Sequence, residues 1–312
     1  MPLSLRRGTV TAIVEPLAEL VRLEVDGIAC IAYPRVTGPV ELGDDVVVNG
    51  QARELGLGSG GFDVLHVNLT RGLALEPEAG AHVMTLPYTS LQHAVPHGEE
   101  DALAESLAGM PVVCCSLHSQ VVPVCAALSA VRVAYVQVAG GALPVSLSDA
   151  VRALRGRRLL AFTVAAAPCL DADVQVVNVY SALAYAAAAG AEAIVCAIGP
   201  GIVGTGTALG HGGLAAAQAV DAVAALGGRA VLAPRVSRSD ARPRHRGLSH
   251  HTQAILRVCL AAPLVPDELE PERWREECAG LPLSHMGRGP DDDPDFFAAA
   301  FAAGHLARSL LT

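Results

Sequence analysis

The chain contains no lysine, so all 22 of its basic residues are arginine. This absence excludes catalysis through a lysine Schiff base, and it excludes the phosphate-binding P-loop, which requires a lysine. No uninterrupted apolar run reaches the roughly 20 residues that a membrane-spanning helix needs. The N-terminal segment MPLSLRRGTVTAIVE lacks the apolar core of a secretory signal. We therefore expect a cytoplasmic protein that has no membrane partner.

The eight cysteines form no C-x-x-C pair, which excludes the common zinc-ribbon and redox motifs. Most of them lie in apolar runs, where a reduced cysteine behaves as a small hydrophobic residue. Aromatic residues make up only 4% of the chain, and the formal net charge is −9. A surface of this composition is not suited to nucleic acid as a whole. We predict no nucleic-acid partner, and any basic site has to be local.

The first part of the chain has the pattern of a small β domain. Residues 1–70 contain short alternating or β-branched segments that are separated by turn residues, at 7–14, 19–25, 28–33, 45–49 and 62–68. We predict a small barrel whose role is packing or homo-oligomer formation. Residues 71–108 are rich in proline and acids, and we expect them to form a connection.

The remainder, residues 109–312, alternates apolar runs with helical segments, which is typical of β-α-β units. The predicted fold class is α/β: a doubly wound, mostly parallel, Rossmann-like sheet preceded by a small N-terminal β-barrel-like domain. In such sheets, ligands bind at the carboxyl ends of the strands. The loops that follow the apolar runs are therefore the places to look for a site.

A glycine-rich loop, GPGIVGTGTALG, follows the apolar run at 191–198. Glycine allows backbone N–H groups to approach an anion closely, and threonine hydroxyls can donate hydrogen bonds to it. The predicted ligand-binding residues of this loop are Gly199, Gly201, Gly204, Thr205, Gly206 and Thr207. The loop also matches the G-x-G-x-x-G dinucleotide pattern, although further glycines postpone the helix that should begin inside it. NADP binding therefore stays open as an alternative.

A second loop, RVSRSDARPRHRGLSHHT, begins at Arg235 and concentrates arginine and histidine. Clustered guanidinium groups bind anions, and Asp240 can hold a neighbouring arginine by a bidentate ion pair. Ser249 has the chemistry of a helix N-cap. The predicted ligand-binding residues are Arg238, Arg242, Arg244, Arg246, Ser249 and His251. We predict catalytic roles, chiefly proton transfer, for His245, His250 and Asp240.

A metal site formed by Asp240, His245, His250 and His251 is an alternative for the same loop. Adjacent histidines on a helix usually point apart, and the H-x-x-x-H and H-E-x-x-H spacings are absent. We therefore predict no metal, and the cofactor stays unknown. Upstream, His118 and Ser119 follow an apolar run, and they either bind the ligand or cap a helix.

Several segments together resemble a bacterial family of unknown function, the one numbered 3866. They are GTVTAI, HVMTLPYTSLQ, GMPVV with LHSQ, VAYV with GGALP, VNVYSAL, GPGIVGTGTALG and RVS with DARPRHRGLSHH. The resemblance implies no activity, but it implies that the chain is one evolutionary unit. The sequence departs from the family pattern at Thr85 and Pro87, where a basic residue is usual, at Cys115, where an acid is common, and in CLDADVQVVN. These departures weaken acid–base chemistry near those positions and leave both loops intact.

These features predict a protein that binds a small anionic ligand, phosphorylated or a nucleotide, at the carboxyl edge of the sheet. A hydrolase or transferase acting on a phosphate-bearing substrate is the expected enzyme class. The alternatives are a non-catalytic oligomeric binding or structural protein and an NADP-dependent oxidoreductase.

Overall fold

The computed structural model describes residues 3–56, 60–269 and 273–311. The chain forms two compact units, Met1–Pro96 and His97–Thr312. The stretch 71–108, for which the sequence predicts a connection, contains the hairpin of β6 (Val83–Thr85) and β7 (His93–Val95). The boundary between the units falls within that stretch.

The first unit contains a closed five-stranded barrel, as the sequence predicts. The strands are β1 (Leu5–Pro16), β2 (Val21–Val25), β3 (Ile28–Ala32), β4 (Asp45–Asn49) and β5 (Asp63–Asn68), in the order β1-β2-β3-β5-β4. Pairing of β1 with β4 closes the barrel. Alternate residues such as Val46 and Val48 are buried inside it. Two short helices, α1 (Pro34–Thr37) and α2 (Gln51–Glu54), lie in the connections.

The second unit is built on a six-stranded, all-parallel sheet. Its strands are β8 (Pro111–Cys115), β9 (Val133–Val138), β10 (Phe162–Ala166), β11 (Val174–Val176), β12 (Ala193–Ile198) and β13 (Arg229–Ala233), in the order β11-β10-β9-β12-β8-β13. The strands are buried along most of their length, which explains why they are continuous apolar runs in the sequence.

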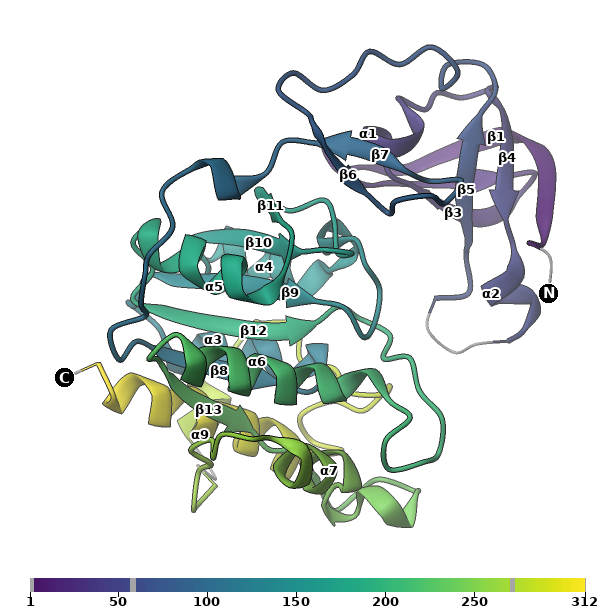
Figure 1. Cartoon of the computed structure of the whole chain (residues 1–312). Helices are drawn as coiled ribbons and strands as arrows, with labels where there is room; N and C mark the ends of the chain where they lie inside the picture. The colour runs from purple at the N-terminus through teal and green to yellow at the C-terminus, as the bar shows by residue number, and fades with distance from the viewer. Residues whose placement is uncertain (1–2, 57–59, 270–272, 312) are drawn as a thin grey trace. The chain divides into compact units, whose positions relative to one another are not determined.

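Helices cover the sheet through two separate cores. Val112 and Cys114 of β8 belong to a core that includes α5 (Val179–Ala188) and α6 (Ala215–Ala225), which lie together in Figure 1. The residues between them, Val113 and Cys115, belong to a second core. That core includes α3 (Val121–Ala127), α4 (Asp149–Gly156) and α9 (Pro294–Ser309). Successive side chains of a strand point to opposite faces, so the two cores lie on opposite sides of the sheet.

Because the six strands are parallel, their carboxyl ends share one edge. Among the connections that leave that edge are those at residues 116–120 after β8, 139–148 after β9, 199–214 after β12 and 234–249 after β13. The last loop leads into α7 (His250–Val258), and α8 (Arg273–Glu277) precedes α9. Within the described ranges, no helix has both the length and the apolar character needed to cross a membrane.

Candidate functional site

The loop after β13 is organised around a buried carboxylate. Asp240 and Arg235 are each only 2% exposed, and they form an ion pair of 3.1 Å. Arg242 binds the same carboxylate with two hydrogen bonds of 2.9 Å, and Arg288 reaches it at 3.3 Å. Burial opposes the charge of Asp240, but hydrogen bonds from Arg242 and the nearby guanidinium groups outweigh it and lower the pKa far below the usual range. Asp240 is therefore a permanent anion that holds the loop in place.

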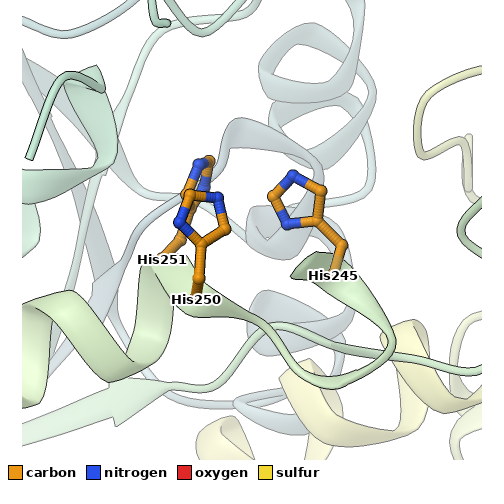
Figure 2. A group of neighbouring side chains, drawn as sticks. All are labelled: His245, His250 and His251. Carbon is orange, nitrogen blue, oxygen red and sulfur yellow. The ribbon is translucent and has the colours of Figure 1, made fainter. Parts of the chain in front are cut away.

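Three predicted histidines converge beside this anchor. His245 lies in a short 3-10 turn, η5 (Pro243–His245), whereas His250 and His251 are the first residues of α7. Figure 2 shows the rings of His250 and His251 side by side, with the ring of His245 next to them. The centroid of His245 lies 4.8 Å from that of His250 and 4.9 Å from that of His251. The structure thus gathers these three imidazoles into one cluster.

The expectation that adjacent histidines point apart is wrong for His250 and His251, whose ring centroids are 4.5 Å apart. Both stand at the very start of α7, directly after the N-cap Ser249, whose side chain accepts a hydrogen bond from the backbone N–H of His251. The angular offset between neighbouring side chains applies to the interior of a helix, and the first turn adjoins a cap of non-helical backbone.

The glycine-rich loop reaches the same cluster from the other side. Its last residue before the turn into α6 is His211, whose ring stacks on that of His251 with centroids 3.8 Å apart. A β-carbon at Gly206 would lie 4.0 Å from Nη1 of Arg244. The loops after β12 and β13, which are separated along the chain by α6 and β13, are therefore in contact at the edge of the sheet.

Other residues of the glycine-rich loop make contacts that fix the conformation of the loop itself. A β-carbon at Gly199 would lie 2.0 Å from the carbonyl oxygen of Ala142, so glycine is required where two loops pass closely. Thr205 and Thr207 bond to each other through their hydroxyls at 2.9 Å. The G-x-G-x-x-G pattern ends at Gly204, whereas the turn into α6 begins at Gly212. The helix start on which dinucleotide binding depends is therefore displaced from the pattern.

The charge around the histidines is positive on balance. Three arginines (Arg235, Arg242 and Arg288) pair with two carboxylates, Asp240 and Asp293. Two further arginines lie close by without a carboxylate partner among the described residues: Arg246 bonds the backbone carbonyl of Asp240, and Arg244 acts on His250. Burial, followed by the charges of Arg235 and Arg242, lowers the pKa of His245 to about 3. Burial, followed by His211 and Arg235, lowers that of His251 to about 2. Burial and Arg244 also lower the pKa of His250. The imidazoles are therefore neutral at pH 7.

A pocket of about 370 Å³ opens at the same edge of the sheet. Its polar lining includes His118, Ser119 and Ser148, and the backbone of Gly201 contributes to the wall. His118 is held within the protein, since its Nδ1 lies 3.2 Å from the carbonyl oxygen of Ile198 and its Nε2 lies 2.6 Å from Ser148 Oγ. Burial lowers the pKa of His118 to about 4, so it is neutral. It shapes the pocket wall.

Ser119 lies against a histidine that the sequence reasoning missed. Its hydroxyl is 3.1 Å from Nδ1 of His285, whose ring stacks on Phe296. Burial, followed by Arg235 and Arg288, lowers the pKa of His285 to about 3. His285 is also one of the residues that line the pocket. It therefore lies within electrostatic range of the arginines that surround Asp240. No motif surrounds His285 in the sequence, so only its position in space reveals it.

One predicted ligand-binding residue lies elsewhere. The side chain of Arg238 is 82% exposed and pairs with Asp295 at the start of α9. Conversely, the structure adds Arg235, His211 and Arg288 to the site. Arg235 follows an apolar run, and His211 follows the glycine-rich loop. These positions in the sequence could have identified both as site residues. Arg288 comes from a distant segment that carries no comparable signal.

A search of curated proteins found no match to this chain. A family model described as "Protein of unknown function (DUF3866)" matches residues 29–277 of the 312. The match covers both loops of the candidate site, and it bears out the resemblance seen in the sequence segments. The chain belongs to the DUF3866 family of proteins of unknown function.

Proposed function

We propose that this protein binds a small anionic ligand, phosphorylated or a nucleotide, where the glycine-rich loop meets the arginine–histidine loop. One observation carries the proposal: arginine charge exceeds carboxylate charge at this point of a chain whose net charge is −9. Asp240 and Asp293 together balance only part of that charge. An anion would complete the balance.

Arg244 is the side chain best placed to meet the ligand. It is exposed, and within the described part of the chain it forms no hydrogen bond or ion pair. Arg246 is also exposed and uses only its Nε in a bond to the carbonyl of Asp240. Arg242 is committed to Asp240, so it orients the loop and adds charge at longer range. The backbone around Gly206 would face the ligand opposite Arg244.

The neighbouring pocket suits the uncharged part of such a ligand. Its volume of about 370 Å³ falls within the range of small-molecule sites. His285 connects the pocket to the arginines electrostatically. A hydrolase or transferase reaction stays a prediction, because the low pKa values of His245 and His251 make them weak proton acceptors without an anion beside them. A bound anion raises the pKa of an adjacent imidazole.

We also infer that the sheet is doubly wound, from the order of its strands and the faces that its helices cover. The chain runs from β8 outward to β11, with α3 and α4 in one core. It then returns to β12 and continues to β13, with α5 and α6 in the other core. The strand order reverses beside β12, the kind of place where ligands bind in doubly wound sheets.

The proposal is tested by thermal unfolding in the presence of inorganic phosphate or pyrophosphate at constant ionic strength. A ligand at roughly 100 times its Kd stabilises the folded state by about 2.7 kcal/mol, which raises Tm. We expect Arg244→Gln to abolish most of the shift while leaving Tm without ligand unchanged, since Arg244 is exposed.

Arg257→Gln is the matched control, because Arg257 is an exposed arginine in the last turn of the same helix that begins with His250. It should retain the full shift. An equal shift in wild type and Arg244→Gln contradicts the proposed site. Stabilisation by NADP but not by pyrophosphate indicates the oxidoreductase alternative instead. A lower molar mass of Arg244→Gln than of wild type, measured by light scattering, indicates instead that the arginines pair with a partner subunit.

A further inference from the structure

The three clustered histidines present ring nitrogens to one small volume. One ring nitrogen from each of His245, His250 and His251 lies within 4.8 Å of the other two. Figure 2 shows that the rings come from two separate segments, the turn before Gly247 and the start of α7. Each neutral imidazole carries one N–H donor and one nitrogen lone pair, and a lone pair that finds no donor can bind a cation.

Two of the rings have a nitrogen available for a ligand. Nδ1 of His245 lies 2.7 Å from Ser249 Oγ, and donation from Nδ1 to that oxygen leaves the lone pair on Nε2. A hydrogen bond of this kind commonly orients a metal-binding histidine. Nε2 of His250 is buried, and among residues 3–56, 60–269 and 273–311 it has no hydrogen-bond partner. A buried nitrogen without a partner is costly unless something binds it.

His251 is held by a replaceable contact. Its Nδ1 lies 3.3 Å from Nη1 of Arg235, which can only donate. Coordination through Nδ1 would replace this long hydrogen bond, and Arg235 would keep its ion pair with Asp240. The ring is supported on its other face by His211, which stacks on it with planes 16° apart.

We propose that His245, His250 and His251 bind a divalent transition-metal ion of the Zn²⁺ class. Imidazole suits Zn²⁺ and its neighbours, whereas Mg²⁺ and Ca²⁺ require oxygen ligands, and this set contains no carboxylate. Zn–N distances of about 2.0–2.1 Å place tetrahedral ligand atoms roughly 3.4 Å apart, so nitrogens that lie within 4.8 Å of one another need to close by at most about 1.4 Å. Three protein ligands leave a further position for water or an anion.

The surrounding arginines set the character of this site. Their positive charge opposes a bare cation, so we expect weaker binding than at a closed structural zinc site. The same charge favours an anion at the remaining coordination position. The metal inference stands on the imidazole geometry alone, and it does not require the anion proposed above.

The test is calorimetric titration of the full-length, metal-stripped protein with ZnCl₂ alone in phosphate-free buffer. We expect one ion per chain. His250→Gln and His245→Gln should each weaken binding at least about tenfold. His82→Gln is the matched control, since His82 is an exposed histidine of the first unit, and it should bind like wild type. Arg244→Gln should bind Zn²⁺ at least as tightly, because it removes a positive charge that acts on His250.

Visible absorption of bound Co²⁺ identifies the ligands independently of affinity. Nitrogen and oxygen coordination gives ligand-field bands without thiolate charge-transfer bands, and we expect these bands to disappear in His250→Gln. Circular dichroism checks that each variant is folded, and His250→Asn serves if His250→Gln is not. The inference is overturned if wild type binds no Zn²⁺, if the histidine variants bind it unchanged, or if the spectrum shows thiolate ligands. Pyrophosphate stabilisation without metal binding would leave the anion site standing and reject the metal site.

Discussion

At the scale of single residues, the buried charges around Asp240 decide the shape of the site. Its carboxylate is bound by Arg235, Arg242 and Arg288, which come from three different positions along the chain. Such a centre is stabilising only while each charge has its partner, because a buried charge without a partner is strongly unfavourable. The sequence predicts a bidentate pair between Asp240 and a neighbouring arginine, and Arg242 forms that pair.

Asp240→Asn should therefore destabilise the second unit strongly. The change keeps the shape of the side chain but leaves Arg235, which is 2% exposed, without a counter-charge. Removing one partner of a buried pair lowers the free energy of unfolding by about 3–5 kcal/mol. Urea unfolding followed by circular dichroism measures the loss. Asp291→Asn is the control, because Asp291 is 91% exposed in its pair with Arg275, and about 0–1 kcal/mol is expected there.

At the scale of secondary-structure elements, close packing between helices depends on small residues. Helix α9 packs against α3, and Gly304 of α9 lies at their contact. A β-carbon at Gly304 would lie 2.5 Å from the carbonyl oxygen of Val124. The alanine-rich composition of α9 is visible in the sequence, but the residue that touches α3 depends on how the two helices cross.

Gly304→Ala and Gly156→Ala should therefore have opposite effects. Gly156 ends α4, and a β-carbon there would meet no atom within 4 Å. Its replacement by alanine favours the helix by up to about 1 kcal/mol. At Gly304 the same replacement forces α3 and α9 apart, and we expect a loss of about 1–3 kcal/mol. Thermal unfolding of both variants compares them, and equal Tm values would contradict the packing described here.

At the scale of the whole molecule, the thiols report how completely the chain is folded. All eight cysteines are free, and every one except Cys259 is buried. Burial raises the pKa of Cys30 and of Cys278 to about 12. A buried thiol with a raised pKa is inert, because the thiolate is the reactive form.

We expect a thiol reagent to modify only Cys259 while the protein is native and all eight cysteines after unfolding. Reducing agents should leave Tm unchanged, because all eight thiols are free and the folded chain has no disulfide to lose. Titration with a chromogenic disulfide at pH 8 measures both numbers. Rapid reaction of several thiols in the native protein would show that one of the two units opens readily.

The amino-acid sequence by itself determined the local features of this protein. Alternating short segments predicted the barrel strands, continuous apolar runs predicted buried parallel strands, and loop composition marked the glycine-rich and arginine–histidine segments. These features depend on neighbours within a few residues, so their pattern is visible in one dimension.

Only the tertiary structure decided which side chains meet. Strand order brings the loops after β12 and β13 to one edge, and the helix start at His250 turns two adjacent rings toward His245. Arg288 and His285 join them from a segment that has no motif. Contacts of this kind depend on how strands and helices pack over long separations in the chain, and local sequence pattern carries no record of that packing.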